Sequence, residues 1–309
     1  MKIAFIYPGQ GAQYVGMGKE VYENYTEAKR VFEQASDSLG FDLAKLCFEG
    51  PEEELIKTEN TQPAILTVSI ALTKVLQKKG VNSDVSAGLS LGEYASLVLA
   101  GAIDFEHAVK IVKNRGKYMQ SVVPEGKGTM AAIMGLDNEI VEEICKISSN
   151  MGIVEPANYN CPGQLVISGE VDAVKRAVEL AKEKGAKRAV VLSVSAPFHS
   201  SMLIMAGKLL EKDLENIPVY DLAMPVISNV TADYVKKEEI KNLLVSQVSH
   251  PVLWEQSIRK MIKDEVDTFI EIGPGKTLTG FLKKIDKSKT ALNFEDESSL
   301  LKTLSFLGV

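Results

Sequence analysis

The sequence predicts an α/β protein in which a mostly parallel sheet, covered by helices on both faces, is interrupted by a smaller inserted unit. Two observations predict this class. Apolar strand-like segments alternate with helix-like segments near both ends of the chain. Between about 126 and 196 the order is instead strand, helix, strand, strand, helix, strand, which is the split βαβ or ferredoxin-like arrangement. We therefore expect one domain of residues 1–125 and 197–309, and an inserted domain of residues 126–196.

The large domain begins with an apolar segment that reads as a buried strand and runs into a glycine-rich turn, Pro8 to Gln13. Pro63 suits the first turn of a helix, and Gly80 follows its last apolar position. The predicted large-domain strands are 3–7, 85–87, 225–229 and 268–272, and the predicted helices are 63–79, 91–100, 201–215, 238–248 and 251–264.

The inserted unit has alternating apolar strands and two amphipathic helices. A turn over Asn160–Gly163 joins its two central strands. Its length of about 70 residues is enough for a unit with its own core. The predicted strands are 129–134, 152–158, 164–168 and 189–194, and the predicted helices are 138–149 and 173–184.

Composition excludes several classes of protein. The 309 residues carry a net charge of −6, and the basic residues form no arginine-rich block, so we expect no nucleic-acid partner. No apolar run is long enough for a membrane span, and the first residues read as a strand rather than a signal peptide. Three cysteines without a C-x-x-C pair predict neither disulfides nor a metal site. We expect a cytoplasmic monomer in which Cys161 is a small buried thiol.

The segment Gly88-Leu89-Ser90-Leu91-Gly92 predicts a nucleophilic serine. Glycines two positions before and after a serine permit a tight strand-to-helix turn that exposes the hydroxyl. The amide of Leu91 then points towards the same space and can stabilise an oxyanion. The pattern indicates acyl transfer through a serine ester, although such short strings also occur by chance.

A serine nucleophile needs a base, and the chain has three histidines. His199 stands where the insert returns to the large domain, at a cleft between domains, and is the best candidate. His107 lies in the first turns of a helix, where an exposed or capping role is favoured. His250 precedes Pro251, and a structural role is favoured there. No carboxylate is compelling as the third member, so a backbone carbonyl is the expected partner of the histidine.

Arg115 and two glycine-rich strings leave alternatives open. Spacing alone favours a solvated Arg115, but a buried arginine would need an anion, and its fork fits a carboxylate. Gly273-Pro274-Gly275-Lys276-Thr277 ends like a P-loop but lacks the earlier glycine, which favours a strand-to-helix turn. Gly9-Gln10-Gly11 follows a strand without the third glycine of a dinucleotide site, so two exposed amides are its expected contribution.

Taken together and in order, these segments resemble the malonyl-CoA:acyl carrier protein transacylases of bacterial type II fatty-acid synthesis. The resemblance covers essentially the whole chain. It implies an α/β-hydrolase-like large domain with a ferredoxin-like insert, malonyl-CoA as substrate, the phosphopantetheine thiol of acyl carrier protein as acceptor, and no bound cofactor or metal. The segments that carry it are Pro8–Gln13, Gly88–Tyr94, Arg115, Phe198-His199, Gln247 with His250-Pro251, and Ile272–Gly275.

The resemblance also implies roles for individual residues. Ser90 is the nucleophile, His199 the base, and the backbone carbonyl of Gln247 the group that orients the histidine. The amides of Gln10 and Leu91 form the oxyanion hole.

Two further residues are implied to contact the substrate: Arg115 holds the malonyl carboxylate, and Gln62 lines the pocket. Phe198 stands directly before the base, and we expect it to narrow the pocket against branched acyl groups. Two positions depart from the family pattern: Leu89 stands where the family often has His, and His250 where it often has Asn. Leu89 leaves the mechanism intact, because that position is not the base.

Two other functions compete with acyl transfer. A serine hydrolase would use the same elbow with His250 and Asp221 or Asp233, but it gives Arg115 and the insert no task. A non-catalytic module that binds acyl carriers would need neither Ser90 nor His199. Acyl transfer is therefore the favoured hypothesis.

Overall fold

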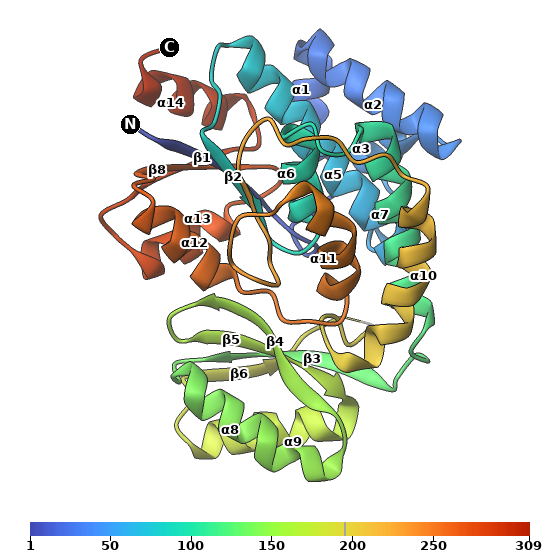
Figure 1. Ribbon diagram of the computed structural model, residues 1–309, viewed down its shortest axis with the longest axis vertical. Helices are drawn as coiled ribbons and strands as arrows, with labels where there is room; N and C mark the ends of the chain where they lie inside the picture. Colours follow the sequence, from blue (N-terminus) through green and yellow to red (C-terminus); the bar gives the residue numbers. More distant parts are fainter. Residues whose placement is uncertain (195) are drawn as a thin grey trace.

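The computed structural model describes residues 1–194 and 196–309, and these residues form two separate sheets (Figure 1). The larger sheet has the strand order β7-β2-β1-β8-β9, and all of its neighbouring strands are parallel. This agrees with the predicted mostly parallel sheet. Its strands are β1 (Ile3–Tyr7), β2 (Val85–Gly88), β7 (Val226–Ile227), β8 (Thr268–Ile272) and β9 (Thr290–Phe294).

Strand β1 lies in the middle of this sheet and has both faces covered, which explains its continuous apolar sequence. Phe5 and Tyr7 pack on one face, and Ala4 and Ile6 on the other. The register pairs Tyr7 with Gly88, so β1 and β2 end at the same edge. Parallel sheets commonly bind ligands beyond this edge.

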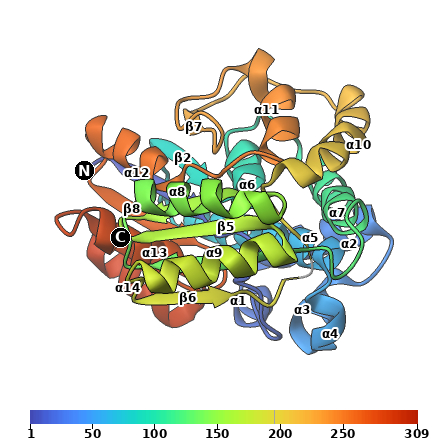
Figure 2. The same ribbon diagram turned by 90° about the horizontal axis from the view of Figure 1, so that it is seen from below.

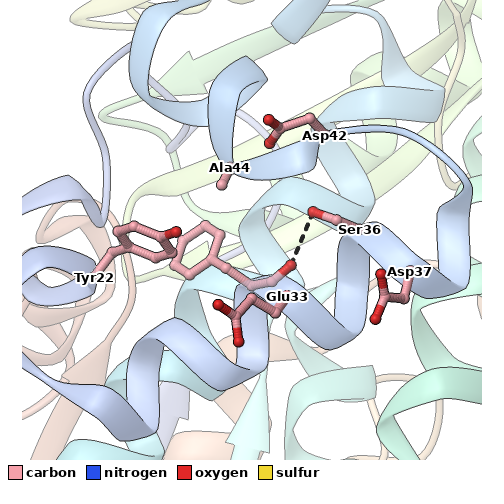
Figure 3. A pocket seen from close by; sticks show the side chains of 7 residues that line it. Tyr22, Glu33, Ser36, Asp37, Asp42 and Ala44 are labelled. Carbon is pink, nitrogen blue, oxygen red and sulfur yellow. Dashed lines mark hydrogen bonds between the residues drawn. The ribbon is translucent and has the colours of Figure 1, made fainter.

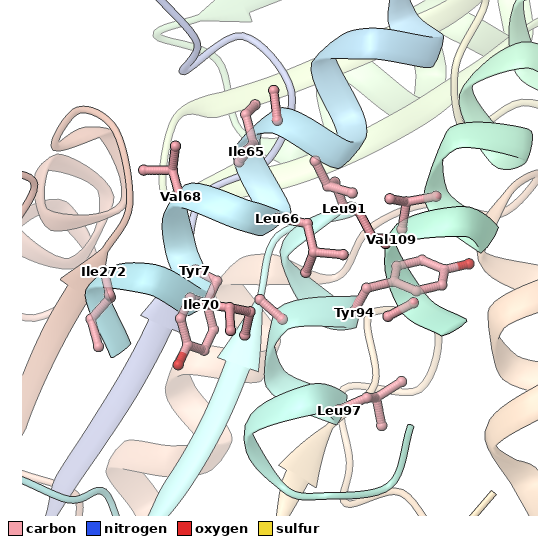
Figure 4. Packing of buried hydrophobic residues seen from close by; sticks show 14 of the residues in the cluster. Tyr7, Ile65, Leu66, Val68, Ile70, Leu91, Tyr94, Leu97, Val109 and Ile272 are labelled. Carbon is pink, nitrogen blue, oxygen red and sulfur yellow. The ribbon is translucent and has the colours of Figure 1, made fainter. Parts of the chain in front are cut away.

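Helices from distant segments cover the two faces (Figure 1). On one face the apolar side chains of three helices pack against the sheet, as Figure 4 shows around Tyr7 and Leu66. These helices are α5 (Thr58–Lys78), α6 (Gly92–Leu99) and α7 (Phe105–Ser121). The other face carries α12 (Trp254–Lys263) and α13 (Thr277–Ile285).

The helix predicted over 63–79 begins earlier, at Thr58, so Pro63 lies inside it rather than in its first turn. Tertiary packing explains the difference, because the segment from Thr58 to Pro63 is largely buried against α7. The turn from Gly273 to Lys276 joins β8 to α13, as predicted for that string.

The sequence interpretation assigned no structure to residues 19–55, which form four helices. Their side chains surround a hollow between α1, α2 and α3, lined by Tyr22, Glu33 and Asp42 among others (Figure 3). None of the residues that line it belongs to the predicted site. The helices are α1 (Lys19–Asn24), α2 (Thr26–Leu39), α3 (Leu43–Glu49) and α4 (Glu52–Leu55).

The smaller sheet is antiparallel with the order β4-β5-β3-β6, which agrees with the ferredoxin-like prediction. Figure 2 shows its two helices side by side across one face, and a separate apolar core lies beneath them. Its elements are β3 (Gly128–Met134), α8 (Asn138–Ser148), β4 (Val154–Cys161), β5 (Gln164–Glu170), α9 (Val171–Glu183) and β6 (Arg188–Val191). Ser195, in the returning segment, lies outside the described residues, and the domain boundaries at 126 and 196 stay a proposal.

The remaining helices close the large domain. They are α10 (Ile204–Glu215), α11 (Ile240–Gln247) and α14 (Glu297–Leu307), with short 3₁₀ turns at 149–151, 201–203 and 237–239. In the described part of the chain, no helix combines the length and the apolar character needed to cross a membrane.

Candidate active site

Ser90 occupies the tight turn between β2 and α6 that the glycines predict. Its φ of 52° lies in the left-handed region, which is unusual for a residue with a side chain. A Cβ at Gly88 would overlap the backbone of Gly92, and a Cβ at Gly92 would overlap the carbonyl of Tyr7. The two glycines are therefore required by the close approach of three backbone segments.

Asn229 stabilises this turn from the loop after β7. Its Oδ1 accepts a hydrogen bond from the Ser90 amide at 2.6 Å, and its Nδ2 donates to the Gly88 carbonyl at 2.7 Å. The side chain is fully buried, so it satisfies two backbone groups that would otherwise lie unpaired. Sequence reasoning did not find Asn229.

His199 lies beside Ser90, although 109 residues separate them in the chain. The Nε2 atom is 2.7 Å from Ser90 Oγ, and Nδ1 is 2.8 Å from the backbone oxygen of Gln247. A carbonyl can only accept, so Nδ1 carries the proton and donates it, which leaves the lone pair of Nε2 facing the serine. This is the tautomer that a general base requires.

Burial, with the charge of Arg115 as the second cause, lowers the pKa of His199 to about 4. The imidazole is therefore neutral at pH 7 in the resting protein and able to accept the serine proton. A carbonyl oxygen replaces the acidic third member of the usual triad, which adds no negative charge to oppose this shift.

Arg115 is buried, with 1% of its surface exposed, so the solvated arginine favoured by spacing alone is wrong. Its Nη2 donates to Ser90 Oγ at 3.2 Å and to Gln247 Oε1 at 2.9 Å, and its Nη1 donates to Gln62 Oε1 at 2.8 Å. The Nε atom has no partner among the described residues. The guanidinium thus lies beside the nucleophile with donor capacity left for an anion.

Two backbone amides are available near the serine. Neither Gln10 nor Leu91 donates its backbone amide to another group in the part of the chain that the structure describes. The two segments run close together, because Leu89 donates to the Tyr7 carbonyl at 3.0 Å and a Cβ at Gly9 would lie 2.6 Å from the Leu89 carbonyl. Free amides on adjoining turns are what an oxyanion hole needs.

The other predicted residues are found as follows. Gln62 is buried on α5 against Arg115, and Phe198 is buried beside His199 in the large apolar cluster.

The other two histidines lie away from the serine. His107 Nδ1 lies 3.5 Å from Asp104 Oδ2 at the start of α7. The ring of His250 interacts with the Ser246 carbonyl at the end of α11, so neither histidine contacts Ser90. Cys161 is fully buried, as predicted.

Sequence reasoning also missed Glu93 and the side chain of Gln247. Gln247 Nε2 donates to Glu93 Oε2 at 2.6 Å and to the Ser90 carbonyl at 3.0 Å. Burial raises the pKa of Glu93 to about 7. The available signal was a charged residue within an otherwise apolar helix, since α6 reads Gly-Glu-Tyr-Ala-Ser-Leu-Val-Leu.

A parallel sheet that ends in a serine elbow, with a neutral histidine and a buried arginine beside the serine hydroxyl, is the arrangement expected of a serine acyltransferase. The acyl transferase domain family matches residues 4–300, and the chain belongs to this family, among the malonyl CoA-acyl carrier protein transacylases that the sequence resemblance predicted.

Relatives and solved structures agree with this placement. The chain is 48% identical to the malonyl CoA-acyl carrier protein transacylase of Bacillus subtilis, over 97% of this chain and 95% of the relative. A crystal structure of malonyl CoA-acyl carrier protein transacylase from Clostridium perfringens has a TM-score of 0.97 and 54% identity, covering 100% of this chain and 98% of that one. A type II PKS acyl-carrier protein in complex with its malonyl-transacylase also matches, with a TM-score of 0.97, 42% identity and coverage of 99% and 100%.

Proposed function

We propose that the chain transfers a malonyl group from malonyl-CoA to the phosphopantetheine thiol of acyl carrier protein, through an ester on Ser90. The names of the relatives support the substrate and the acceptor. The observation that carries the proposal is a buried arginine within hydrogen-bond distance of the serine hydroxyl. It provides an anion site where a short acyl group with a terminal carboxylate would extend from the reacting carbon.

In the first half-reaction, His199 Nε2 takes the Ser90 proton while Oγ attacks the thioester carbon. The amides of Gln10 and Leu91 stabilise the tetrahedral oxyanion, and each is worth roughly 3 kcal/mol by analogy with measured oxyanion donors. Collapse breaks the carbon–sulfur bond, and the imidazolium returns its proton to the coenzyme A thiolate. The Gln247 carbonyl holds the ring through Nδ1 during both proton transfers.

In the second half-reaction, the carrier thiol binds where coenzyme A left and gives its proton to His199. The sulfur attacks the malonyl-serine ester, the same two amides stabilise the oxyanion, and Ser90 recovers its proton. Two half-reactions through one ester give ping-pong kinetics.

Several finer properties belong to the same proposal. We expect the chain to act as a monomer in the cytoplasm, with no nucleic-acid or membrane partner. The net charge of −6 without a basic block supports the absence of a nucleic-acid partner. We also keep residues 126–196 as a separate inserted domain, which the independent apolar core between its sheet and helices supports.

Mass spectrometry of the intact protein after mixing with malonyl-CoA tests the proposal. We expect a malonyl adduct on Ser90 that a carrier protein removes and that Ser90→Ala does not form. Sustained release of free malonate without an acceptor would favour the hydrolase instead. Absence of any adduct would contradict catalysis at Ser90.

A further inference from the structure

Glu93 is a buried carboxylate that the catalytic scheme leaves unused. It lies in the first turn of α6, three residues after Ser90, with 1% of its surface exposed. Its Oε2 accepts hydrogen bonds from Gln247 Nε2 at 2.6 Å and from the Asn229 amide at 3.1 Å. Burying a carboxylate costs free energy unless a positive charge compensates it, so the role of Glu93 depends on the nearest cation.

Arg115 is that charge, and the side-chain amide of Gln247 connects the two. Gln247 Oε1 accepts from the Arg115 guanidinium, while Nε2 of the same amide donates to Glu93. These contacts fix the orientation of the amide, because the opposite one would set two donors against each other and two acceptors against each other. The groups that accept from Arg115, two glutamine amides and the Ser90 hydroxyl, are uncharged.

We infer that Glu93 is the internal counter-ion of Arg115, connected through Gln247, and that it limits how strongly the site prefers an acyl group with a carboxylate over a neutral one. This inference rests on the proposed malonyl transfer. In the resting protein, Glu93 in its ionised form offsets the charge of Arg115. A malonyl carboxylate on Arg115 adds a second negative charge to the cluster, whereas an acetyl group does not.

Glu93 therefore acts as a positioning residue in two ways. It keeps Arg115 charged and oriented while the site is empty, and it weakens the hold of Arg115 on the malonyl carboxylate. A weaker hold is useful in a ping-pong enzyme, because an acyl-enzyme that is bound too tightly transfers slowly.

The protonation state of Glu93 offers a second way to vary its charge. Burial raises its pKa to about 7, and hydrogen bonds from Asn229 and Gln247 and the charge of Arg115 limit the rise. The titratable groups that surround it respond differently. Burial lowers the pKa of Arg115, but a guanidinium stays protonated in this pH range. His199 is neutral above about pH 4, and burial raises the pKa of Tyr94. Between pH 6 and 8, Glu93 is the member of this set that changes charge.

The test compares acylation of Ser90 by malonyl-CoA and by acetyl-CoA in the full chain, as kcat/KM for each. In Glu93→Gln we expect the malonyl-to-acetyl ratio to rise at least about fivefold, the low end of typical coupling between sites. Malonyl should react faster because Arg115 has lost its competing anion, whereas acetyl brings no charge to Arg115 and its kcat/KM should change little. An equal change with both substrates would overturn the inference.

Glu271→Gln is the matched control. Glu271 is also fully buried, and its carboxylate accepts from the Leu278 and Thr279 amides at the start of α13, outside the site. Neutralising it should leave the malonyl-to-acetyl ratio unchanged. A similar rise in this variant would attribute the effect to loss of any buried charge and overturn the inference.

A measurement on the unmodified chain adds a test that does not require a variant to fold, and Glu93→Gln serves only as its control. The malonyl-to-acetyl ratio should rise as the pH falls from 8 to 6, because protonation neutralises Glu93, and Glu93→Gln should abolish this dependence. A ratio that instead falls as the pH drops from 8 to 6 would overturn the inference while malonyl transfer itself persists. Failure of the unmodified chain to form a malonyl ester would contradict the proposed function, and the inference with it.

Discussion

The Ser90 turn and the His199 loop meet at one hydrogen bond, yet they are built differently. The Ser90 turn is set mainly by its own segment, in which Gly88 and Gly92 permit close backbone contact, and Asn229 from the loop after β7 closes it. The His199 loop, where φ is also positive at 58°, depends on several distant elements. The position of Ser90 is thus determined largely by its own segment, whereas the position of His199 is determined by the tertiary structure.

Strand β4 of the smaller sheet supports the loop that carries His199. Glu155, on β4, accepts from the amide and the hydroxyl of Ser201, two residues after His199, at 2.7 and 2.8 Å. The same strand hydrogen bonds with Val252, five residues after Gln247. One strand therefore supports both the His199 loop and the segment that follows Gln247, whose carbonyl contacts the histidine. The smaller sheet thus helps to position the residues of the site.

The largest expected effect comes from breaking the locally built turn. Gly88→Ala places a Cβ into the backbone of Gly92, and we expect a loss of about 4 kcal/mol or more in unfolding free energy, together with loss of acylation. Urea denaturation measures the change. Gly280→Ala on α13 is the control, because nothing lies within 4 Å of its Cβ; it should stabilise by about 0.5–1 kcal/mol. Equal behaviour of the two variants would contradict the account of the turn.

Removing the asparagine should have a smaller effect on the same turn. Asn229→Ala leaves the Ser90 amide and the Gly88 carbonyl buried without partners, at about 1–3 kcal/mol for each group. Denaturation of Asn114→Ala provides the comparison, since its bond to Asp213 is partly exposed and should be worth about 1 kcal/mol or less. If Asn229→Ala is no more destabilised than Asn114→Ala, the turn does not depend on Asn229.

Because several distant elements hold the His199 loop, we expect loss of one of them to affect the acylation rate more than the free energy of unfolding. Glu155→Ala should lower the rate of Ser90 acylation about tenfold, or about 1.4 kcal/mol in the barrier, because the His199 loop loses its tie to β4. Stopped-flow acylation rates measure this. Glu142→Ala, which removes an exposed bond to Tyr159 in the same sheet, should leave the rate unchanged. An unchanged rate in Glu155→Ala would mean that β4 does not position the base.

The smallest expected effect is a displaced pH profile. Because the base must be neutral, a pKa of about 4 keeps His199 active well below the 6.5 of an unperturbed histidine. We expect inactivation of Ser90 by a neutral sulfonyl fluoride to stay nearly constant from pH 8 to about 5 and then fall. If the inactivation rate instead fell with a midpoint near pH 6.5, His199 would behave as an exposed histidine. Unfolding also takes up a proton at His199 between about pH 4 and 6.5, so acid in that range destabilises the fold.

The difference between the two regions explains what the sequence could predict. Ser90, its helix and the βαββαβ order follow from local patterns, and they lie close to where they were expected. Arg115 was assigned to solvent by spacing, and only the family resemblance placed it against a substrate. Asn229 and Glu93 were missed because their roles depend on hydrogen bonds to residues more than 130 positions away in the chain, and no local sequence pattern indicates such contacts. The helices over residues 19–55 were missed because most of them are short and depend on packing against neighbouring helices such as α5 and α7.

The most direct test of the central claim is the rate of Ser90 acylation in Arg115→Ala, measured with malonyl-CoA and with acetyl-CoA. If the buried guanidinium holds the malonyl carboxylate, malonyl transfer should fall by several kcal/mol in the barrier, while acetyl transfer is retained or increases. Equal loss with both substrates would contradict an anion site beside the nucleophile.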